Sequence, residues 1–539
     1  MSRLRNQGDY CTQRQTFRWE IPSDFNIYKA TVGHPEHAHR RALRHIDTDG
    51  KKTDYTFSEC DLAARKLAQY FDSIDLPQGA RVGIFLSQCP ETIITHMACY
   101  LSRRIAMPLF CLFRHEALHY RLENAEAQCI VCDKEGLEII RQLKPSLPSL
   151  KHVLCVDDDA TAVDLFSNVI KPFDGDRTCD PSGPDDPAVM IYTSGTTGAP
   201  KGALHGHRVL LGHMPCVDMT FECPTPDDNL FWTPADWSWI GGLFDVLMPS
   251  LLVGSGIVSY RFKKFDPLLA FDLMAQESVR NVFLPPTALK LMRSAHPKGR
   301  RQDISLRTAM SGGEALSGEL LDWGREVLGV SINELYGQTE CNLVLGNSGL
   351  LFPQKQGSIG KPVPGHDVVL LDDHGEIIEA DYQTGQIAVA APDPVMMLGY
   401  WNNEVATAEK YHGDYLLTGD FGYRDEEGYY FFDGRRDDLI SVAGYRIGPT
   451  EIEDCIVSHP DVAMVAVIGI PDEVKGQVIK AFVVPRGGRQ PDLEFVEELK
   501  GRVRNRLAAH EVPKFIEFVD ALPLTATGKI IRAELRNRL

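Results

Sequence analysis

A loop at residues 192–202 combines glycines, hydroxyl side chains and one lysine. It follows the apolar segment 188–191, and its candidate ligand-binding residues are Thr193, Ser194, Gly195, Thr196, Thr197, Gly198 and Lys201. Backbone N–H and side-chain O–H groups in such a loop can surround a polyphosphate, to which a lysine adds positive charge. Pro200 stands where a Walker A loop has the glycine before its lysine, which excludes that motif. A plain turn needs neither so many hydroxyl groups nor the lysine, so we predict a phosphate-binding loop.

Further segments resemble, in order along the chain, the motifs of the adenylate-forming superfamily. That superfamily comprises acyl-CoA synthetases, luciferases and the adenylation domains of peptide synthetases, and its signature loop is similar to residues 192–202. The other matching segments are 311–315 with Gly313, Glu314 and Ala315; 336–340 with Tyr336, Gly337, Gln338, Thr339 and Glu340; 418–420 with Asp420; 433–438 with Arg435 and Asp437, followed by 443–447 with Ala443, Gly444, Tyr445 and Arg446; and 523–530 with Lys529. Any one motif could arise by chance, but the ordered set, spread over about residues 50–535, is specific. The resemblance implies an AMP-forming short- or medium-chain acyl-CoA synthetase, with ATP, Mg²⁺ and coenzyme A as co-substrates.

The resemblance also implies a role for each segment of the nucleotide site. The turn at 313–315 would bind adenine, Asp420 would hold the ribose hydroxyls, and Thr339 with Glu340 would meet the phosphates and Mg²⁺. The remaining residues implied for ATP and AMP are the loop residues above together with Tyr336, Gly337, Gln338 and Arg435. The implied catalytic residues are Lys529, Glu340 and Thr339.

These residue types suit the chemistry of adenylation. Joining a carboxylate to the α-phosphate of ATP brings two anions together and builds negative charge on phosphorus, so the site needs fixed cations and donors. Lys529 and Lys201 are such cations, a carboxylate such as Glu340 suits Mg²⁺, and the planar fork of Arg435 suits phosphate or ribose oxygens. Taken singly, Glu340 could equally be a helix cap and Lys529 a solvated lysine.

A second half-reaction is implied for the C-terminal part of the chain. In the family, a small domain turns about a hinge after adenylation, which corresponds here to Asp437, and brings a CoA-binding loop to the acyl group. That loop corresponds to residues 443–446, where Gly444 has no side chain and would let a pantetheine arm pass close to the backbone. The chain ends ten residues after Lys529, which predicts no fused carrier domain.

The acyl pocket is predicted from Trp237 and Gly337. Segment 232–242 holds three of the six tryptophans and resembles the pocket region of short- and medium-chain synthetases, although core packing would also explain it. Acetyl-CoA synthetases typically have Trp where Gly337 stands, so we expect a gap there that buries further carbons at ~0.8 kcal/mol each. Short branched, medium-chain or thioether acids are therefore expected over acetate. The alternative for Gly337 is a tight turn with positive φ.

The elements that position these residues alternate between short apolar strands and amphipathic helices. Strands are predicted at 81–87, 105–110, 129–133, 152–156, 188–194 and 281–286, with helices at 57–74 and 90–103. This alternation indicates an α/β fold with a sheet covered on both faces. From about residue 363 the strands are shorter and separated by turns, which predicts a β-rich antiparallel subdomain. We expect a large N-terminal α/β domain at 1–436 and a small, mobile C-terminal α+β domain at 437–539.

Composition limits the function classes. The chain has 539 residues and a net charge of −18, which argues against a nucleic-acid partner. Its best apolar stretch, 243–258, is interrupted by polar residues, proline and glycines, so no membrane span is expected. The first 20 residues are charged and have no apolar core, so no secretory signal is expected. Scattered cysteines favour a cytoplasmic location. A homodimer is one possible assembly. The alternative functions are an acetyl- or propionyl-CoA synthetase, a stand-alone ligase that loads a carrier protein, a luciferase-like enzyme, and a non-catalytic nucleotide-binding protein.

Overall fold

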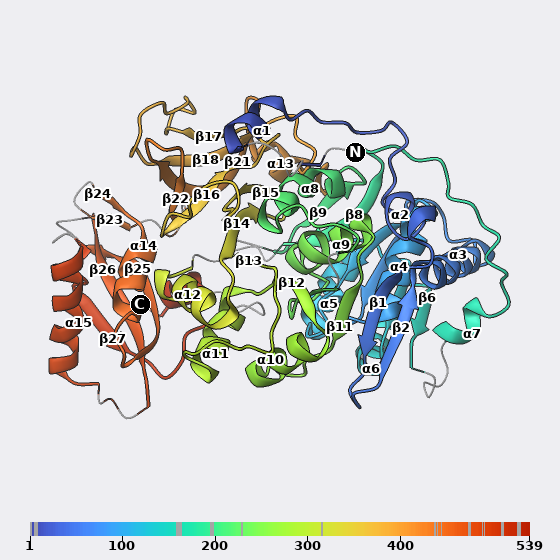
Figure 1. The fold of residues 1–539 in the computed structure, drawn as a ribbon, viewed down its shortest axis with the longest axis horizontal. Coiled ribbons are helices and arrows are strands. Elements are labelled where there is room, and N and C mark those ends of the chain that lie inside the picture. Colours follow the sequence, from blue (N-terminus) through green and yellow to red (C-terminus); the bar gives the residue numbers. More distant parts are fainter. Residues whose placement is uncertain are drawn as a thin grey trace.

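The computed structural model of the chain contains three β-sheets, which Figure 1 shows down the shortest axis of the molecule. It describes residues 3–4, 9–157, 164–193, 199–227, 230–313, 316–435, 438, 440–442, 445–472, 476–487, 489, 491–507, 511–524 and 530–538. Two large sheets and their helices form the bulk of the molecule, and the third sheet, orange to red in Figure 1, lies at one end of it.

An eight-stranded sheet with a parallel centre carries the N-terminal part of the fold. In sheet order its strands are β19 (Gly399–Tyr400), β9 (Gly202–Gly206), β8 (Pro187–Tyr192), β4 (Ile105–Pro108), β3 (Arg81–Phe85), β5 (Cys129–Cys132), β6 (His152–Cys155) and β7 (Asp164–Leu165). Its helices are α3 (Phe57–Ser73), α4 (Pro90–Leu101), α5 (His115–Asn124) and α6 (Lys134–Leu143). Helix α3 begins at a capping box, in which Thr56 and Glu59 each accept the other's backbone N–H. Strands β4 and β5 are buried along their whole length, as continuous apolar runs predict.

A 14-stranded sheet begins as a parallel α/β sheet. That half contains β14 (Ile332–Gln338), β13 (Thr308–Gly312), β12 (Val279–Phe283), β10 (Leu230–Trp232), β11 (Ile257–Tyr260) and β1 (Arg41–Ile46), and ends at the antiparallel β2 (Lys52–Thr56). Its helices are α8 (Val209–Thr220), the π-helix η3 (Gly241–Leu247), α9 (Met248–Val253), α10 (Pro267–Gln276), α11 (Pro286–Ala295), α12 (Gly318–Trp323) and η4 (Gly324–Leu328). The six predicted strands and two predicted helices are therefore confirmed, with ends within a few residues of the observed ones.

Beyond β14 the same sheet becomes antiparallel. Its further strands are β15 (Cys341–Gly346), β16 (Ser358–Pro362), β22 (Tyr430–Arg435), β21 (Tyr415–Arg424), β18 (Gly385–Ala390) and β17 (Val368–Leu371), with β20 (Tyr411–His412) beside β21. This is the β-rich subdomain that the turn signals predicted. Shorter helices elsewhere in the large part are α1 (Tyr10–Thr16), α2 (Ile27–Ala30), η1 (Pro35–His37), η2 (Lys144–Ser146), α7 (Phe166–Ile170) and α13 (Glu404–Ala408).

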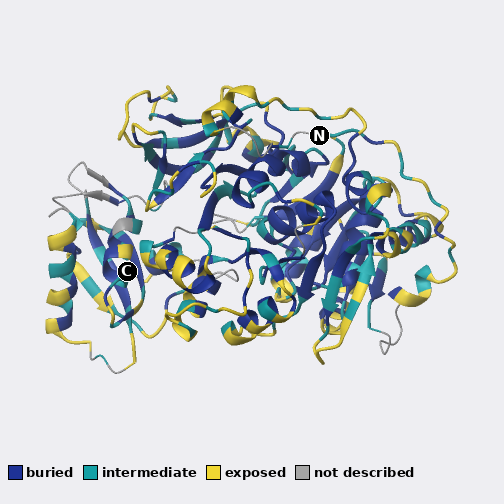
Figure 2. Ribbon diagram, viewed as in Figure 1, coloured by how far each residue is buried: buried dark blue, intermediate teal, exposed yellow. Residues whose placement is uncertain are grey.

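The main hydrophobic core lies between the two large sheets. It joins residues of α4, α8, η3 and α9 to inward-facing residues of both sheets. Figure 2 shows α4, α8 and α9 largely in dark blue, the colour of buried residues. None of the described helices is long and apolar enough to cross a membrane.

The third sheet has five strands, all formed by residues from 440 onward. They are β24 (Tyr445–Ile447), β23 (Ile440–Val442), β26 (Gly476–Pro485), β25 (Val462–Asp472) and β27 (Phe515–Phe518), with helices α14 (Pro449–Val457), α15 (Leu493–Arg506) and α16 (Arg532–Arg536). These elements have a hydrophobic core of their own. The expected fold class, a large α/β unit with a β-rich subdomain and a small α+β unit, is confirmed.

Helix α16 is tied to the start of the small unit by four charged side chains, which we call the anchor cluster. Arg532 Nη2 lies 2.7 Å from Glu453 Oε2, and its Nη1 lies 3.3 Å from Asp438 Oδ2. Arg536 Nη2 lies 2.6 Å from Asp438 Oδ1. These pairs are largely shielded from water and so are screened by salt less than surface pairs.

Candidate functional site

The predicted phosphate loop connects the antiparallel neighbours β8 and β9. The backbone N–H of Thr193 donates to the carbonyl of Lys201 at 2.9 Å, directly beyond the pair Tyr192–Gly202. The base of the loop is therefore closed, as expected for a loop between paired strands. Its inner residues, Ser194, Gly195, Thr196, Thr197 and Gly198, lie outside the described residues.

Asp420 on β21 is held by side chains from β14 and β22. Tyr336 Oη donates to Asp420 Oδ2 at 2.7 Å, and Arg435 Nε donates to Oδ1 at 3.1 Å. Gln338 Nε2 donates to the carbonyl of Thr418 at 2.9 Å. Burial, and next the charge of Asp420, raise the pKa of Tyr336 well above its usual range, which keeps this hydroxyl a donor. Gln338 Nε2 is a third donor, in a long bond of 3.4 Å to Oδ2. A carboxylate has about four lone-pair positions, so Asp420 has one open position for a ligand hydroxyl and gains a second if a ligand displaces the long bond from Gln338.

Tyr400 on β19 connects Glu340 with Lys201. Tyr400 Oη donates to Glu340 Oε1, and Lys201 Nζ lies 5.2 Å from the centroid of the Tyr400 ring. Burial, and next the charge of Glu340, raise the pKa of Tyr400. Glu340 and Lys201, which belong to motifs far apart in the sequence, thus both contact Tyr400. The sequence motifs did not point to this tyrosine.

Glu340 could hold Mg²⁺ through its other carboxylate oxygen. No described residue donates a hydrogen bond to Glu340 Oε2. Among the described residues no group of three or more His, Cys, Asp or Glu side chains is arranged to bind a metal. A Mg²⁺ ion here would therefore take one carboxylate together with phosphate oxygens and water, which is a common arrangement for this ion.

Several predicted segments follow the carboxyl ends of parallel strands. Trp237 follows β10, Gly313 follows β13, and Gln338 ends β14. In open α/β sheets ligands bind at this edge. Gly313 has φ +97°, a conformation that favours glycine, whereas Glu314 and Ala315 lie outside the described residues.

The expected gap at Gly337 is wrong. A Cβ at this position would lie 2.5 Å from Asn342 Oδ1 and 2.9 Å from Asn342 Cα, so the neighbouring strand β15 fills the space. The register between β14 and β15 shifts between Tyr336 and Gln338, which brings the β15 backbone against Gly337. The positive-φ alternative is wrong too, because Gly337 is not among the glycines with positive φ. Gly337 permits a close approach of two strands.

Replacing Gly337 with alanine should therefore destabilise the fold by about 1–3 kcal/mol, because the new Cβ forces β15 to move. Gly337→Trp should lower activity on acids of every length alike, together with a lower thermal midpoint. Gly487→Ala is the matched control, since nothing lies within 4 Å of a Cβ there. A stable Gly337→Trp variant that loses only its longer substrates would restore the open-pocket interpretation.

Trp237 is 1% exposed and packs in the main core, as the core-packing alternative expects, and its role in the acyl pocket stays a prediction. Trp239, two residues later, is partly exposed and contacts Phe110 and Phe113 with ring centroids at 5.5 and 6.2 Å. The spacing of Trp237 and Trp239 in the sequence does not by itself tell which of the two faces a ligand.

Other residues beside the site carried no recognisable sequence signal. Lys410 Nζ donates to Gln338 Oε1 at 2.8 Å, and Asn342 contacts Asp245 and His213 behind Gly337. The predicted residues Lys529, Asp437, Ala443 and Gly444 lie outside the described residues, and only the backbone of Tyr445 and Arg446 is described.

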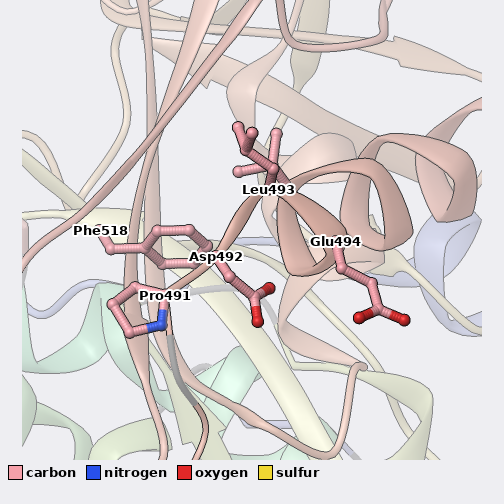
Figure 3. Close-up of a pocket in the computed structure, with 6 residues that line it drawn as sticks. Pro491, Asp492, Leu493, Glu494 and Phe518 are labelled. Atoms are coloured by element: carbon pink, nitrogen blue, oxygen red, sulfur yellow. The ribbon is translucent and has the colours of Figure 1, made fainter.

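A surface depression of about 640 Å³ lies on the small unit (Figure 3). Its lining residues are Pro491, Asp492, Leu493, Glu494, Val496 and Phe518. Asp492 there caps α15 by accepting the backbone N–H of Phe495 at 2.8 Å. None of the described candidate residues lines it, so it is a separate feature of the small unit.

Known proteins are similar to this chain in both sequence and fold. The family model "AMP-binding enzyme" matches residues 33–401, and "AMP-binding enzyme C-terminal domain" matches residues 451–529. Acetyl-coenzyme A synthetase of Bacillus subtilis (strain 168) is 33% identical, over 94% of this chain and 89% of its own length. Acyl-coenzyme A synthetase ACSM4, mitochondrial, of Homo sapiens is 31% identical, over 92% and 86%. The solved structure of anthranilate CoA ligase AuaEII with anthranoyl-AMP has a TM-score of 0.87 at 26% identity, covering 96% of this chain and 98% of that one.

Proposed function

This chain belongs to the AMP-binding enzyme family and is an AMP-forming acid–CoA ligase, and from that premise we propose how its residues divide the reaction. In the first half-reaction an oxygen of the acid attacks the α-phosphorus of ATP, and pyrophosphate leaves. In the second, the thiol of coenzyme A attacks the acyl carbonyl, the acyl–phosphate bond breaks, and AMP leaves. The arrangement around Asp420 is the observation that supports this proposal most.

We assign the nucleotide to the edge formed by β13, β14, β21 and β22. Asp420, held by Tyr336 and Arg435, would accept the ribose hydroxyls with its remaining lone pairs. Gly313 directly follows β13, the strand beside β14, and an adenine ring would lie there. Lys201 and the hydroxyl-rich loop after β8 would face the phosphates. This places the reacting α-phosphate between the loop and the segment 336–340.

Glu340 would hold Mg²⁺, and Tyr400 would fix the orientation of that carboxylate. When bound, the ion supplies positive charge to the phosphate oxygens as pyrophosphate leaves. Thr339 would donate its hydroxyl to a phosphate. Lys529 would stabilise negative charge on the phosphorus during the first half-reaction only.

We propose two domains, 1–436 and 437–539, that rotate about Asp437 between the half-reactions. The third sheet and its separate core support this boundary, because they contain only residues beyond 437. Residues 443–446 would then line the path of the pantetheine arm. The thirteen cysteines are free, which favours a cytoplasmic location, and a homodimer stays a prediction.

The preferred acid is a small organic acid. The names of the relatives range from acetyl- to anthranilate-activating enzymes, and the filled space at Gly337 removes the argument against acetate and propionate. Short branched, medium-chain and thioether acids stay predictions on equal terms with these. Loading of a carrier protein instead of coenzyme A is the alternative second step.

The proposed function is tested with purified protein, ATP, Mg²⁺ and a panel of straight, branched, aromatic and sulfur-containing acids. We expect pyrophosphate release that depends on the acid, followed by AMP release that depends on coenzyme A. Release of ADP, or of pyrophosphate without any acid, would contradict the proposal. AMP release with a carrier protein but not with coenzyme A would favour the alternative.

Gly444→Leu should affect only the second half-reaction. A branched side chain beside the pantetheine arm should lower coenzyme-A-dependent AMP release at least about tenfold, while acyl-adenylate still accumulates. The measurement is pyrophosphate and AMP release from one reaction mixture. Acyl-CoA formation at the normal rate would place the path of coenzyme A elsewhere.

A further inference from the structure

A buried polar cluster lies directly behind Gly337. It consists of Asp245 on η3, Asn342 on β15 and His213 on α8, which are 2%, 4% and 0% exposed. Asn342 Nδ2 donates to Asp245 Oδ1 at 2.7 Å and contacts His213 Nε2 at 3.1 Å. None of the nucleotide- or metal-binding roles above uses these side chains. We call them the Asp245 cluster.

The proton positions within the cluster follow from its neighbours. His213 Nδ1 lies 2.7 Å from the carbonyl of Val209 and must donate to it, so Nε2 is an acceptor for Asn342. Burial lowers the pKa of His213 to about 3, which keeps the ring neutral. Both N–H groups of the Asn342 amide are therefore used, and His213 offers Asp245 no positive charge.

The second oxygen of Asp245 lacks a donor among the described residues. Only Oδ1 accepts a hydrogen bond, from Asn342. Oδ2 lies 3.5 Å from the position that a Cβ would take at Gly241, and the Phe283 ring is 3.7 Å from the same position. A ligand group that hydrogen-bonds to Oδ2 would therefore displace no protein donor described in the structure.

The surroundings of this oxygen are otherwise apolar. Gly241 begins η3, and the residues before it, Trp239 and Ile240, are partly exposed. The Phe283 ring lies beside Gly241, and Asn342 of the same cluster lies against Gly337 in segment 336–340, where the acid would meet the α-phosphate. A pocket with apolar walls and one polar group at its end binds a ligand with a hydrocarbon body and a polar tip.

The protonation state of Asp245 determines which polar group at the end of the acyl chain it can bind. Burial raises the pKa of Asp245 well above its usual range, and only the hydrogen bond from Asn342 opposes this effect. No described cation pairs with it, so burial favours the neutral carboxyl group, which has one O–H donor besides its acceptor positions. A hydroxyl group can both donate to and accept from such a carboxyl group, whereas a methyl group can do neither.

We propose that Asp245, positioned by Asn342, forms the far end of the acyl pocket and selects acids whose acyl group ends in a hydroxyl over acids that end in a methyl group. The proposal rests on the proposed function, because it needs an acid bound beside residues 336–340. Hydroxyl and methyl groups are similar in size, so the selection comes from hydrogen bonding rather than from shape.

The first test needs only the wild-type protein. Acid-dependent pyrophosphate release is measured on matched pairs: hydroxyacetate with propionate, longer ω-hydroxy acids with their ω-methyl isosteres, and hydroxybenzoates with methylbenzoates. We expect kcat/KM to favour the hydroxy acid at least about tenfold in one or more pairs. If the methyl acid is equal or better in every pair, the proposal is overturned while the proposed function stands. If no acid releases pyrophosphate, the proposed function itself fails.

The second test uses variants at Asp245. Asp245→Leu should lower the hydroxyl-to-methyl ratio at least about tenfold, mainly by loss of activity on the hydroxy acid. Asp245→Asn keeps the size and both hydrogen-bonding capacities, so it should keep a preference for the hydroxy acid. An equal fall of the ratio in both variants would show a packing effect and overturn the proposal, as would an unchanged ratio in Asp245→Leu.

Asp218→Asn is the matched control for general loss of stability. Asp218 is also a buried carboxylate, on α8, but its Oδ1 pairs with Arg3 Nη2 at 2.5 Å on the N-terminal segment. This variant should have a lower thermal midpoint and the wild-type ratio. A changed ratio in Asp218→Asn would mean that destabilisation alone alters selectivity, and would overturn the inference from Asp245→Leu.

Discussion

Replacing Lys529 with alanine is expected to lower acid-dependent adenylate formation at least about 100-fold, the low end for loss of an electrostatic stabiliser. The lysine charge matters while negative charge builds on the phosphorus and pyrophosphate leaves. Thioester formation from supplied acyl-adenylate and coenzyme A involves no such step and should continue. The two rates are measured separately, as pyrophosphate release from ATP and as AMP release from synthetic acyl-adenylate.

A matched control for this variant is Lys514→Ala in the same unit. Lys514 Nζ lies 2.7 Å from Asp472 Oδ2 in an exposed pair, which contributes little to stability. Its removal should leave both rates unchanged. An equal loss of both activities in Lys529→Ala would contradict the division of the half-reactions between two positions of the small domain.

Asp420→Ala is expected to lower kcat/KM for ATP about 100-fold, which corresponds to ~2.7 kcal/mol. Hydrogen bonds to a charged group contribute about 1.5–3 kcal/mol each, and two ribose hydroxyls would lose theirs. The variant also leaves Arg435 without its carboxylate, so a thermal melt accompanies the kinetics. Calorimetric binding of AMP should weaken by the same factor, because AMP keeps the ribose.

Tyr336→Phe distinguishes the contribution of the Asp420 carboxylate from that of the hydroxyl group that orients it. It keeps the ring and Asp420 but removes the hydroxyl that donates at 2.7 Å, a neutral donor to a charged acceptor. We expect a loss in kcat/KM for ATP of about tenfold, less than that of Asp420→Ala. If Asp420→Ala keeps kcat/KM within about threefold of wild type, Asp420 does not bind the ribose.

The strands and the order of the motifs could be predicted from the sequence because both are local patterns. The runs at 105–110 and 129–132 are apolar throughout, as is typical of a strand covered on both faces, and β4 and β5 are such strands. Asp420 and Arg435 were named separately from their motifs, and they prove to be a cross-strand pair on β21 and β22. The turn at 425–428 starts that pairing, and a register shift between Phe421 and Gly422 then brings Asp420 opposite Arg435.

The predictions that failed depend on contacts between distant strands and helices. Whether Gly337 leaves a gap depends on the register of β14 with β15, and that register shifts within the motif itself. Asp245 looks like an interruption in an apolar helix until Asn342, 97 residues later, is placed against it. Tyr400 joins Glu340 only because β19 pairs with β9 at the far edge of the first sheet. Tertiary pairing of this kind leaves no period or spacing to detect.

If the small unit rotates about residue 437 as proposed, the anchor cluster would make it move as one rigid body. Asp438 lies one residue after the proposed hinge, and its two arginine partners lie on the helix that follows residue 529. The bridge between Leu524 and Ile530, and the bond from Ile531 N–H to the carbonyl of Pro523, fasten the other side of the same segment. A rotation of the backbone at residue 437 would therefore move α16 and the segment before it together with Asp438, without a change of structure between them. Arg536→Gln, which removes one ion pair to Asp438, would therefore make the position of Lys529 in the active site less well defined without changing the proposed hinge itself.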